Sequence, residues 1–368
     1  PSAILLLLTK SDKAFCKALK KAISEAVTPL RVNKKGVSTE NLHIVDYDGN
    51  SLKNCSADDK RYIYKMVPME ELAEVIGEDH LYFFAYNSFG QPYETAKRLN
   101  DYIQNVKKET GHDKVNLIPV SLGGSIATAY FDAYGEQGDV NRVCYFVPAT
   151  NGSTLIADIF SKNLDLSNPT SLLGMFLDSK TIESLEKLLK RFHKDTAENI
   201  VGALVDALLE TFLLNCPGMW AVIPREKYQE YRDKYLTGEE YNVLREKTDR
   251  FFKAQNNLRD LLTKIEKQGT EFFSICGYGL PLLPFAGTKN LNSDTIVDFK
   301  SASLGGYSVG ADEKLPENYE PVYDRCQNKE HNHISPEGTV DLGTAIFPDS
   351  TFCFRHQVHD DTAYNDVA

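Results

Sequence analysis

A serine on a sharp turn between a strand and a helix is the most chemically suggestive feature of this sequence. Residues 114–132 read KVNLIPVSLGGSIATAYFD, an apolar run followed by Ser121, two glycines and a helical pattern. A nucleophilic serine needs a tight turn with small neighbours, and Gly123 meets that need. The helix N-terminus and the Leu122 N–H would then point at a developing oxyanion. We therefore predict that Ser121 is the nucleophile of an acyl transfer reaction.

The same turn leaves a plainer interpretation open. Pro119 stands two residues before Ser121, where the G-x-S-x-G pattern has its first glycine. An ordinary strand-to-helix turn also places a serine at the helix N-cap. The nucleophile is favoured because an apolar strand, Ser-x-Gly-Gly and a helix occur together.

A histidine near the end of the sequence is the candidate base. In hydrolases with such a turn, the acid and then the histidine follow the serine along the chain. His359 comes after an apolar run at 351–356 and before two aspartates. Imidazoles exchange protons near neutral pH, as the base of a serine nucleophile must. We predict His359 as the base, with His356 as the alternative.

Two carboxylates compete for the role of the acid that orients the histidine. Both follow the polar stretch 287–336, whose length is typical of functional or mobile loops. Glu337 lies in PEGTV, and Asp341 follows four residues later. Either would hold the imidazole tautomer and stabilise the imidazolium. We prefer Glu337, although PEG also fits a β-turn capped by Asp341.

Alternating apolar and helical patterns must position these residues. Over the first 150 residues this alternation predicts βαβ units, and so an α/β fold with a mostly parallel central sheet flanked by helices. Apolar residues recur every three to four positions in 93–110, which predicts a helix, and another helix follows Ser121. The predicted strands lie at 3–8, 42–46, 81–86, 115–120 and 142–147, and strand patterns return at 271–278 and 351–356.

The middle of the chain lacks strand patterns and predicts an all-helical insertion. On this basis residues 1–150 and 269–368 form the α/β core, and residues 151–268 form a helical cap. The helical periodicity within the cap covers 182–192, 200–214 and 228–265.

Together these motifs resemble the lecithin:cholesterol acyltransferase-like and lipase-like branch of the α/β-hydrolases. The resemblance covers FAYNSFGQPYETAKRLNDYIQNV leading into KVNLIPVSLGGSIA, LLNCPGMWAVIP in the helical region, and PEGTV followed by a distal histidine. It implies the α/β-hydrolase fold and a triad of Ser121, Glu337 and His359. The sequence departs from the family at Glu337, where an aspartate is usual.

The resemblance also implies how a substrate is held. Residues 216–224 match the lid element of the family, so Met219 and Trp220 are expected to line the substrate pocket. The family carries a Gly-rich loop after its first strand, which donates the second oxyanion N–H. This sequence has TKSDKAF there, so the oxyanion hole is complete only if Thr9 or Lys10 supplies that donor beside Leu122.

Charge and histidine spacing argue against other partners. The formal net charge of −11 opposes binding to nucleic acid, and no basic patch compensates for it. His331 and His333 in HNHISPEG form half of a metal site, but no cysteine or carboxylate pair stands at ligand spacing. We therefore predict no metal and no cofactor.

Cysteine usage and hydropathy bear on the compartment. Seven cysteines without a CxxC pair argue against a complete disulfide framework. The apolar start at 3–8 is too short to cross a membrane. The cytoplasm is favoured, while secretion after removal of a leader, transient contact with a membrane surface and the oligomeric state stay open.

These observations predict a serine-dependent carboxylic ester hydrolase of the lipase or esterase kind, with a small-molecule or lipid-like ester as substrate. Two alternatives remain from the sequence. One is an acyltransferase that uses an alcohol acceptor. The other is a non-catalytic relative that binds a ligand.

Overall fold

The computed structural model describes residues 28–40, 50–67, 69–165, 194–326 and 328–360, and a few isolated positions between these ranges. Several sequence predictions lie outside the described residues. They are the strand at 3–8 with Thr9 and Lys10, most of the strand at 42–46, and the helix at 182–192 except for one position.

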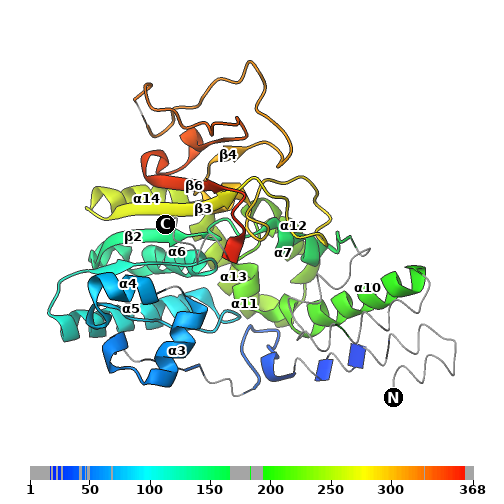
Figure 1. The fold of residues 1–368 in the computed structure, drawn as a ribbon. Helices are drawn as coiled ribbons and strands as arrows, with labels where there is room; N and C mark the ends of the chain where they lie inside the picture. The colour runs from blue at the N-terminus through cyan, green and yellow to red at the C-terminus, as the bar shows by residue number, and fades with distance from the viewer. Residues whose placement is uncertain are drawn as a thin grey trace.

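A parallel four-stranded sheet forms the centre of the structure (Figure 1). Its strands are ordered β1-β2-β3-β6, and every neighbouring pair is parallel. The prediction of an α/β protein with a parallel sheet flanked by helices is confirmed. The strands are β1 (Val115–Leu117), β2 (Val140–Phe146), β3 (Glu271–Tyr278) and β6 (Thr351–Arg355).

Two predicted strands differ from the structure, because a strand is defined by its hydrogen-bond partners and not by an apolar pattern alone. The strand predicted at 81–86 is wrong: within this segment only Tyr82 forms a bridge to another described residue, Ser51. The strand predicted at 115–120 ends as β1 at Leu117, because Pro119 lacks an N–H to donate. The chain then rejoins the sheet through a single bridge between Val120 and Phe146.

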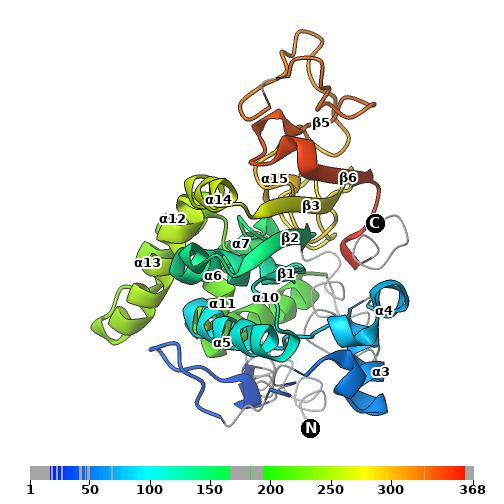
Figure 2. The same ribbon diagram turned by 90° about the vertical axis from the view of Figure 1, so that its left-hand side faces the viewer.

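Two helices cover one face of the sheet as predicted, and two more pack beside them (Figure 2). In α5 (Pro92–Thr110), the Gln91 side chain accepts from an N–H of the first turn, and Gly111 ends the helix in a left-handed conformation. α6 (Gly123–Tyr134) is buried along most of its length against α5. α13 (Asn242–Asn256) and α14 (Leu258–Lys267) also contact α6.

The remaining helices of the middle region form a second apolar cluster. It centres on Phe160, Phe212, Trp220 and Tyr231, all of which are buried. The cluster also takes in Leu244 from the start of α13, whereas Phe251 of α13 and the buried residues of α14 pack in the apolar layer of the sheet. The helices that build it are α7 (Thr154–Ser161), α10 (Lys194–Thr211), α11 (Pro217–Trp220) and α12 (Arg225–Tyr235).

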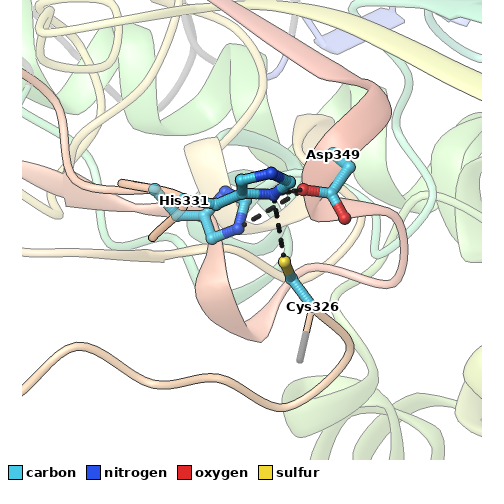
Figure 3. A group of neighbouring side chains, drawn as sticks. Cys326, His331 and Asp349 are labelled. Carbon is cyan, nitrogen blue, oxygen red and sulfur yellow. Dashed lines mark hydrogen bonds and ion pairs between the residues drawn. The ribbon is translucent and has the colours of Figure 1, made fainter. Parts of the chain in front are cut away.

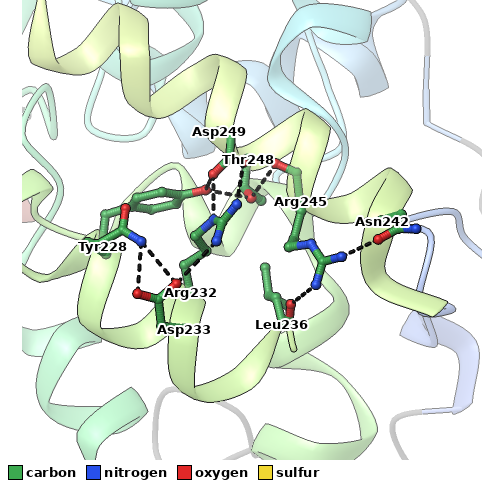
Figure 4. A network of polar contacts seen from close by, with 9 residues as sticks. Tyr228, Arg232, Asp233, Leu236, Asn242, Arg245, Thr248 and Asp249 are labelled. Carbon is green, nitrogen blue, oxygen red and sulfur yellow. Dashed lines mark hydrogen bonds and ion pairs between the residues drawn. The ribbon is translucent and has the colours of Figure 1, made fainter. Parts of the chain in front are cut away.

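The periodicity at 228–265 predicts one long helical stretch, but the structure divides it into α12, α13 and α14. A polar network fastens α12 to α13 across the first break (Figure 4). Arg232 makes two hydrogen bonds of 2.9 Å to the Asp249 carboxylate, and the Tyr228 hydroxyl donates to the same group at 2.6 Å. Paired geometry of this kind is the strong form of an ion pair.

Smaller elements complete the described chain. The segment between β4 and β5 projects beyond β6, on the side of the sheet away from α5 (Figures 1 and 2). Among the described residues, no helix is both long and apolar enough to cross a membrane. The smaller helices and strands are α3 (Ala57–Met66), α4 (Glu70–Ile76), α15 (Phe299–Ala302), β4 (Tyr307–Ser308) and β5 (Val340–Asp341), of which β4 and β5 pair antiparallel.

Candidate active site

Ser121 occupies the turn between the end of the β1 segment and α6, and its backbone is strained there. Its φ is 51°, in the left-handed region that non-glycine residues rarely adopt. The Ser121 N–H donates to Phe146 at 2.9 Å, and its carbonyl accepts from Ala149 and Gly124 at 2.9 Å each. These bonds to β2, to the chain after it and to the first turn of α6 hold the serine in a conformation that costs about 1–3 kcal/mol.

The small residue that this turn needs is Gly124, and not Gly123 as the sequence suggests. A Cβ on Gly124 would come within 2.9 Å of the Pro148 Cβ and 3.3 Å of the Ala149 nitrogen. A Cβ on Gly123 would meet Pro119 at 3.5 Å, an ordinary contact. Gly124 is therefore the position that lets α6 start close to the chain that leaves β2.

His359 lies against Ser121, as the sequence predicts for the base. The His359 Nε2 and Ser121 Oγ are 2.9 Å apart. The histidine follows β6 by four residues and is 8% exposed. His356, the alternative base, directly follows the same strand as an exposed residue with a φ of 59°, and its ring lies beside Gly279.

Asp294 is the carboxylate that contacts His359. Its Oδ2 lies 2.7 Å from the His359 Nδ1, and the side chain is fully buried. The other oxygen, Oδ1, accepts the N–H groups of Ile296 and Val297 at 3.1 and 2.8 Å. Both oxygens of a buried carboxylate are thus satisfied, which is the condition for keeping it in the interior.

The prediction of Glu337 as the partner of the histidine is wrong in this geometry. The Glu337 carboxylate instead accepts from Thr339 at 3.1 Å and faces Arg355 at 3.9 Å. The alternative, Asp341, is also engaged elsewhere: it accepts from Tyr319 and from the Gly343 N–H at 2.8 and 2.7 Å. The alternative drawn from the sequence, a β-turn at PEG that is capped by Asp341, describes these two residues better.

Asp294 reaches the histidine because the chain after β3 folds back on itself. Leu280 and Ser293 form an antiparallel bridge, and a second bridge joins Ser293 to Asp298. The Asn292 side chain accepts the Gly279 N–H at 2.7 Å. This reversal of the chain places Asp294 at the carboxyl edge of the parallel sheet, where Ser121 and His359 also lie. In open α/β sheets ligands bind at that edge.

The Leu122 N–H has the position expected of an oxyanion donor. It follows the serine at the first turn of α6, and within the described residues no backbone or side-chain acceptor takes its hydrogen. The second donor predicted at Thr9 lies outside the described residues. Directly after the serine, the helix N-terminus therefore offers one N–H that has no acceptor among the described residues.

Of the two residues expected in the substrate pocket, Trp220 belongs to the interior of the helical cluster. It is 2% exposed, its Nε1 donates to Leu214 at 2.9 Å, and its ring packs edge-on against Phe160. Its role as a pocket residue is therefore wrong. Met219 is partly buried and packs in the same apolar cluster as Leu122, next to the nucleophile turn.

A second buried carboxylate stands near the site. Asp298 is 8% exposed, and its Oδ2 accepts from the Thr154 N–H and hydroxyl at 2.9 Å each. Burial raises the pKa of Asp298 to about 7. The Thr154 hydrogen bonds lower this pKa, and the negative charge of Asp294 raises it further.

The fold also gathers a group of possible metal ligands that the sequence interpretation missed. Cys326 and Asp349 lie beside His331 and His333 in the folded chain. The sequence shows no cysteine or carboxylate at the usual ligand spacing from these histidines, but folding brings one of each to them. The only sequence signal was the His-x-His pair followed by an aspartate.

Comparison of the sequence with models of known protein families and with curated proteins gives no significant match to either.

Proposed function

We propose that the chain is a serine-dependent carboxylic ester hydrolase with an α/β-hydrolase fold. One observation carries the proposal: Ser121, His359 and Asp294 form a continuous hydrogen-bonded chain, with contacts of 2.9 and 2.7 Å. The strained serine on a strand-to-helix turn and the order serine, aspartate, histidine along the chain support the same assignment.

The proposed reaction proceeds through an acyl-enzyme. His359 takes the proton of the Ser121 hydroxyl as Oγ attacks the ester carbonyl. The Leu122 N–H donates to the oxygen that becomes negative, while Asp294 holds the imidazole and balances its charge. When the C–O bond of the ester breaks, His359 returns the proton to the alcohol. Water then adds by the same path and releases the acid.

The substrate class that we propose is an ester with an apolar acyl chain. Leu122, Met219, Ile156 and Ile296 are partly buried members of one apolar cluster at the nucleophile turn. Apolar surface beside a polar reacting group is the usual lining of small-molecule sites. A long acyl chain would bury apolar surface there that a short one would leave exposed to water.

A fluorophosphonate probe tests the nucleophile directly. The wild-type protein should label, and Ser121→Ala should not, while Ser88→Ala, a change at an exposed serine, should label like the wild type. Circular dichroism would confirm that both variants fold. A folded wild-type protein that never labels would favour the non-catalytic ligand binder.

A series of p-nitrophenyl esters then tests the substrate class. We expect kcat/KM to rise with acyl chain length in the wild type and to vanish for every ester in Ser121→Ala. A preference for acetate over longer chains would contradict an apolar acyl site. Adding an alcohol and measuring free acid against new ester would separate hydrolysis from acyl transfer.

A further inference from the structure

Four side chains that ligate metals in proteins converge at one place, away from Ser121. The Cys326 Sγ, one atom each of His331 and His333, and an Asp349 oxygen all lie within 4.8 Å of one another. His331 Nδ1 is 3.3 Å from Cys326 Sγ and 2.8 Å from Asp349 Oδ1 (Figure 3). The His333 Nε2 lies 3.6 Å from the same oxygen.

An ion pair with a hydrogen-bonded thiol explains three of these residues but not His333. The His333 side chain is 8% exposed, and its Nε2 is buried without a hydrogen-bond partner among the described residues. A contact of 3.6 Å is too long to be a hydrogen bond. A buried ring nitrogen without a partner is costly, and so it needs an explanation. A cation held between these atoms would satisfy it.

We propose that Cys326, His331, His333 and Asp349 bind a structural Zn²⁺ ion. A thiolate, two imidazoles and a carboxylate are the ligands that zinc takes in proteins. Zinc lies about 2.3 Å from sulfur and about 2.0–2.1 Å from nitrogen, so tetrahedral ligand atoms are about 3.3–3.6 Å apart. The contacts of 2.8, 3.3 and 3.6 Å lie close to that spacing.

The ligand count indicates the role of the ion. Four protein ligands close a tetrahedral zinc, which is typical of structural sites, since catalytic ones keep a position for water. The backbone around His333 is already fixed, because its carbonyl accepts the Leu342 N–H at 2.9 Å. An open surface hollow of about 530 Å³, lined in part by His331, His333 and Asp349, gives the ion access from solvent.

The proposed ion would fasten the long polar segment to the strand that leads to the base. Cys326, His331 and His333 come from the segment between β4 and β5. Asp349 lies in a short 3-10 helix directly before β6, and His359 follows that strand. The zinc proposal stands on its own ligands and does not depend on the hydrolase proposal.

Zinc content is the first test. Untagged wild-type protein, dialysed against a weak chelator, should retain about one zinc ion per chain, because four preorganised ligands bind tightly. Cys326→Ser and His333→Ala should retain none, while Cys55→Ser and His112→Ala, outside the group, should match the wild type. Wild-type protein without zinc, or ligand variants that keep it, would overturn the proposal.

Cobalt substitution is a second readout that does not depend on activity. Co²⁺ added to the zinc-free wild type should give the thiolate charge-transfer band and the intense visible bands of a tetrahedral site. Cys326→Ser should lose the charge-transfer band, while Cys55→Ser should keep it.

Because Cys326 and His333 are buried, Asp349→Asn, at a half-exposed side chain, serves as a ligand variant that does not disturb the interior. A wild-type spectrum of octahedral Co²⁺ without a thiolate band would contradict the ligand set.

Discussion

Asp294 and His359 are joined at two points, once through their side chains and once through their backbones. The His359 Nδ1 lies 2.7 Å from the Asp294 Oδ2, and the His359 N–H donates to the Asp294 carbonyl at 2.7 Å. The two contacts fix the position of the imidazole as well as its tautomer. The ring is thereby aimed at Ser121.

Asp294→Asn should remove most of the activity without unfolding the protein. An amide cannot hold the imidazole in the tautomer that accepts the serine proton, and the equivalent change in serine proteases lowers kcat about 10⁴-fold. Steady-state kinetics on a p-nitrophenyl ester would measure the loss, with thermal unfolding as the check on the fold.

Glu337→Gln is the matched control, because Glu337 is the carboxylate that the sequence suggested. It contacts Thr339 and Arg355 and not His359, so its variant should stay within about tenfold of the wild-type kcat/KM, well short of a triad loss. If Glu337→Gln lost most of the activity and Asp294→Asn kept it, the contact between Asp294 and His359 would not be the catalytic one.

Gly124→Ala should damage the nucleophile turn, whereas Gly123→Ala should not. The new methyl group at 124 would meet Pro148 at 2.9 Å and push α6 away from the chain after β2. Overpacking of this kind costs about 1–3 kcal/mol, and displacement of Ser121 should lower kcat in addition. Denaturant unfolding and probe labelling of the two variants would measure both effects; equal behaviour would show that the close approach is not needed.

The pairing of Ser121 with His359 could be predicted because local sequence marks both residues. Ser121 has its strand, glycines and helix within about twenty residues, and His359 follows the last strand. Asp294 carries no comparable pattern, since it sits in a polar stretch and reaches the site through the bridges that fold residues 280–298 back. Its one signal was position: it follows β3, whose carboxyl end meets that of β6 at one edge of the sheet.

The fold shows the same division between local and distant information. β3 and α5 were predicted within a residue, because each has a complete pattern of its own. The segment 81–86 has the composition of a strand but needs partners that composition does not supply. The zinc ligands were missed for a related reason, as Asp349 follows His333 by sixteen residues and only folding brings the two together.

Trp220→Ala should destabilise the protein, and Met219→Ala should change its substrate preference. Trp220 fills the interior of the helical cluster, and removing such a side chain costs about 3–5 kcal/mol. Met219 is only partly buried and packs with Leu122, so its truncation should raise KM for long-chain esters more than for short ones. Unfolding curves and a chain-length series would separate the two. If Trp220→Ala kept the wild-type stability but changed the substrate preference, Trp220 would line the substrate pocket after all.

Asp298 should make the protein lose stability as the pH rises from about 4 to about 7. The carboxyl loses its proton near pH 4 in the unfolded chain, but burial raises its pKa to about 7 in the folded protein. Between these values the folded state binds one more proton than the unfolded state. The free energy of unfolding therefore falls by about 1.4 kcal/mol per pH unit from this group alone.

Asp298→Asn isolates that contribution, because the amide cannot titrate. The half-exposed Glu226 carboxylate acts in a lower window: desolvation raises its pKa, but the hydrogen bonds from Lys300 and Asn151 outweigh this effect and bring the pKa to about 2. Denaturant unfolding between pH 5 and pH 7 should thus show a wild-type curve that falls relative to Asp298→Asn. Asp312→Asn, at an exposed aspartate, should run parallel to the wild type. Parallel curves for Asp298→Asn would mean that the Asp298 carboxyl is ionised throughout this range, and that the Thr154 hydrogen bonds outweigh its burial.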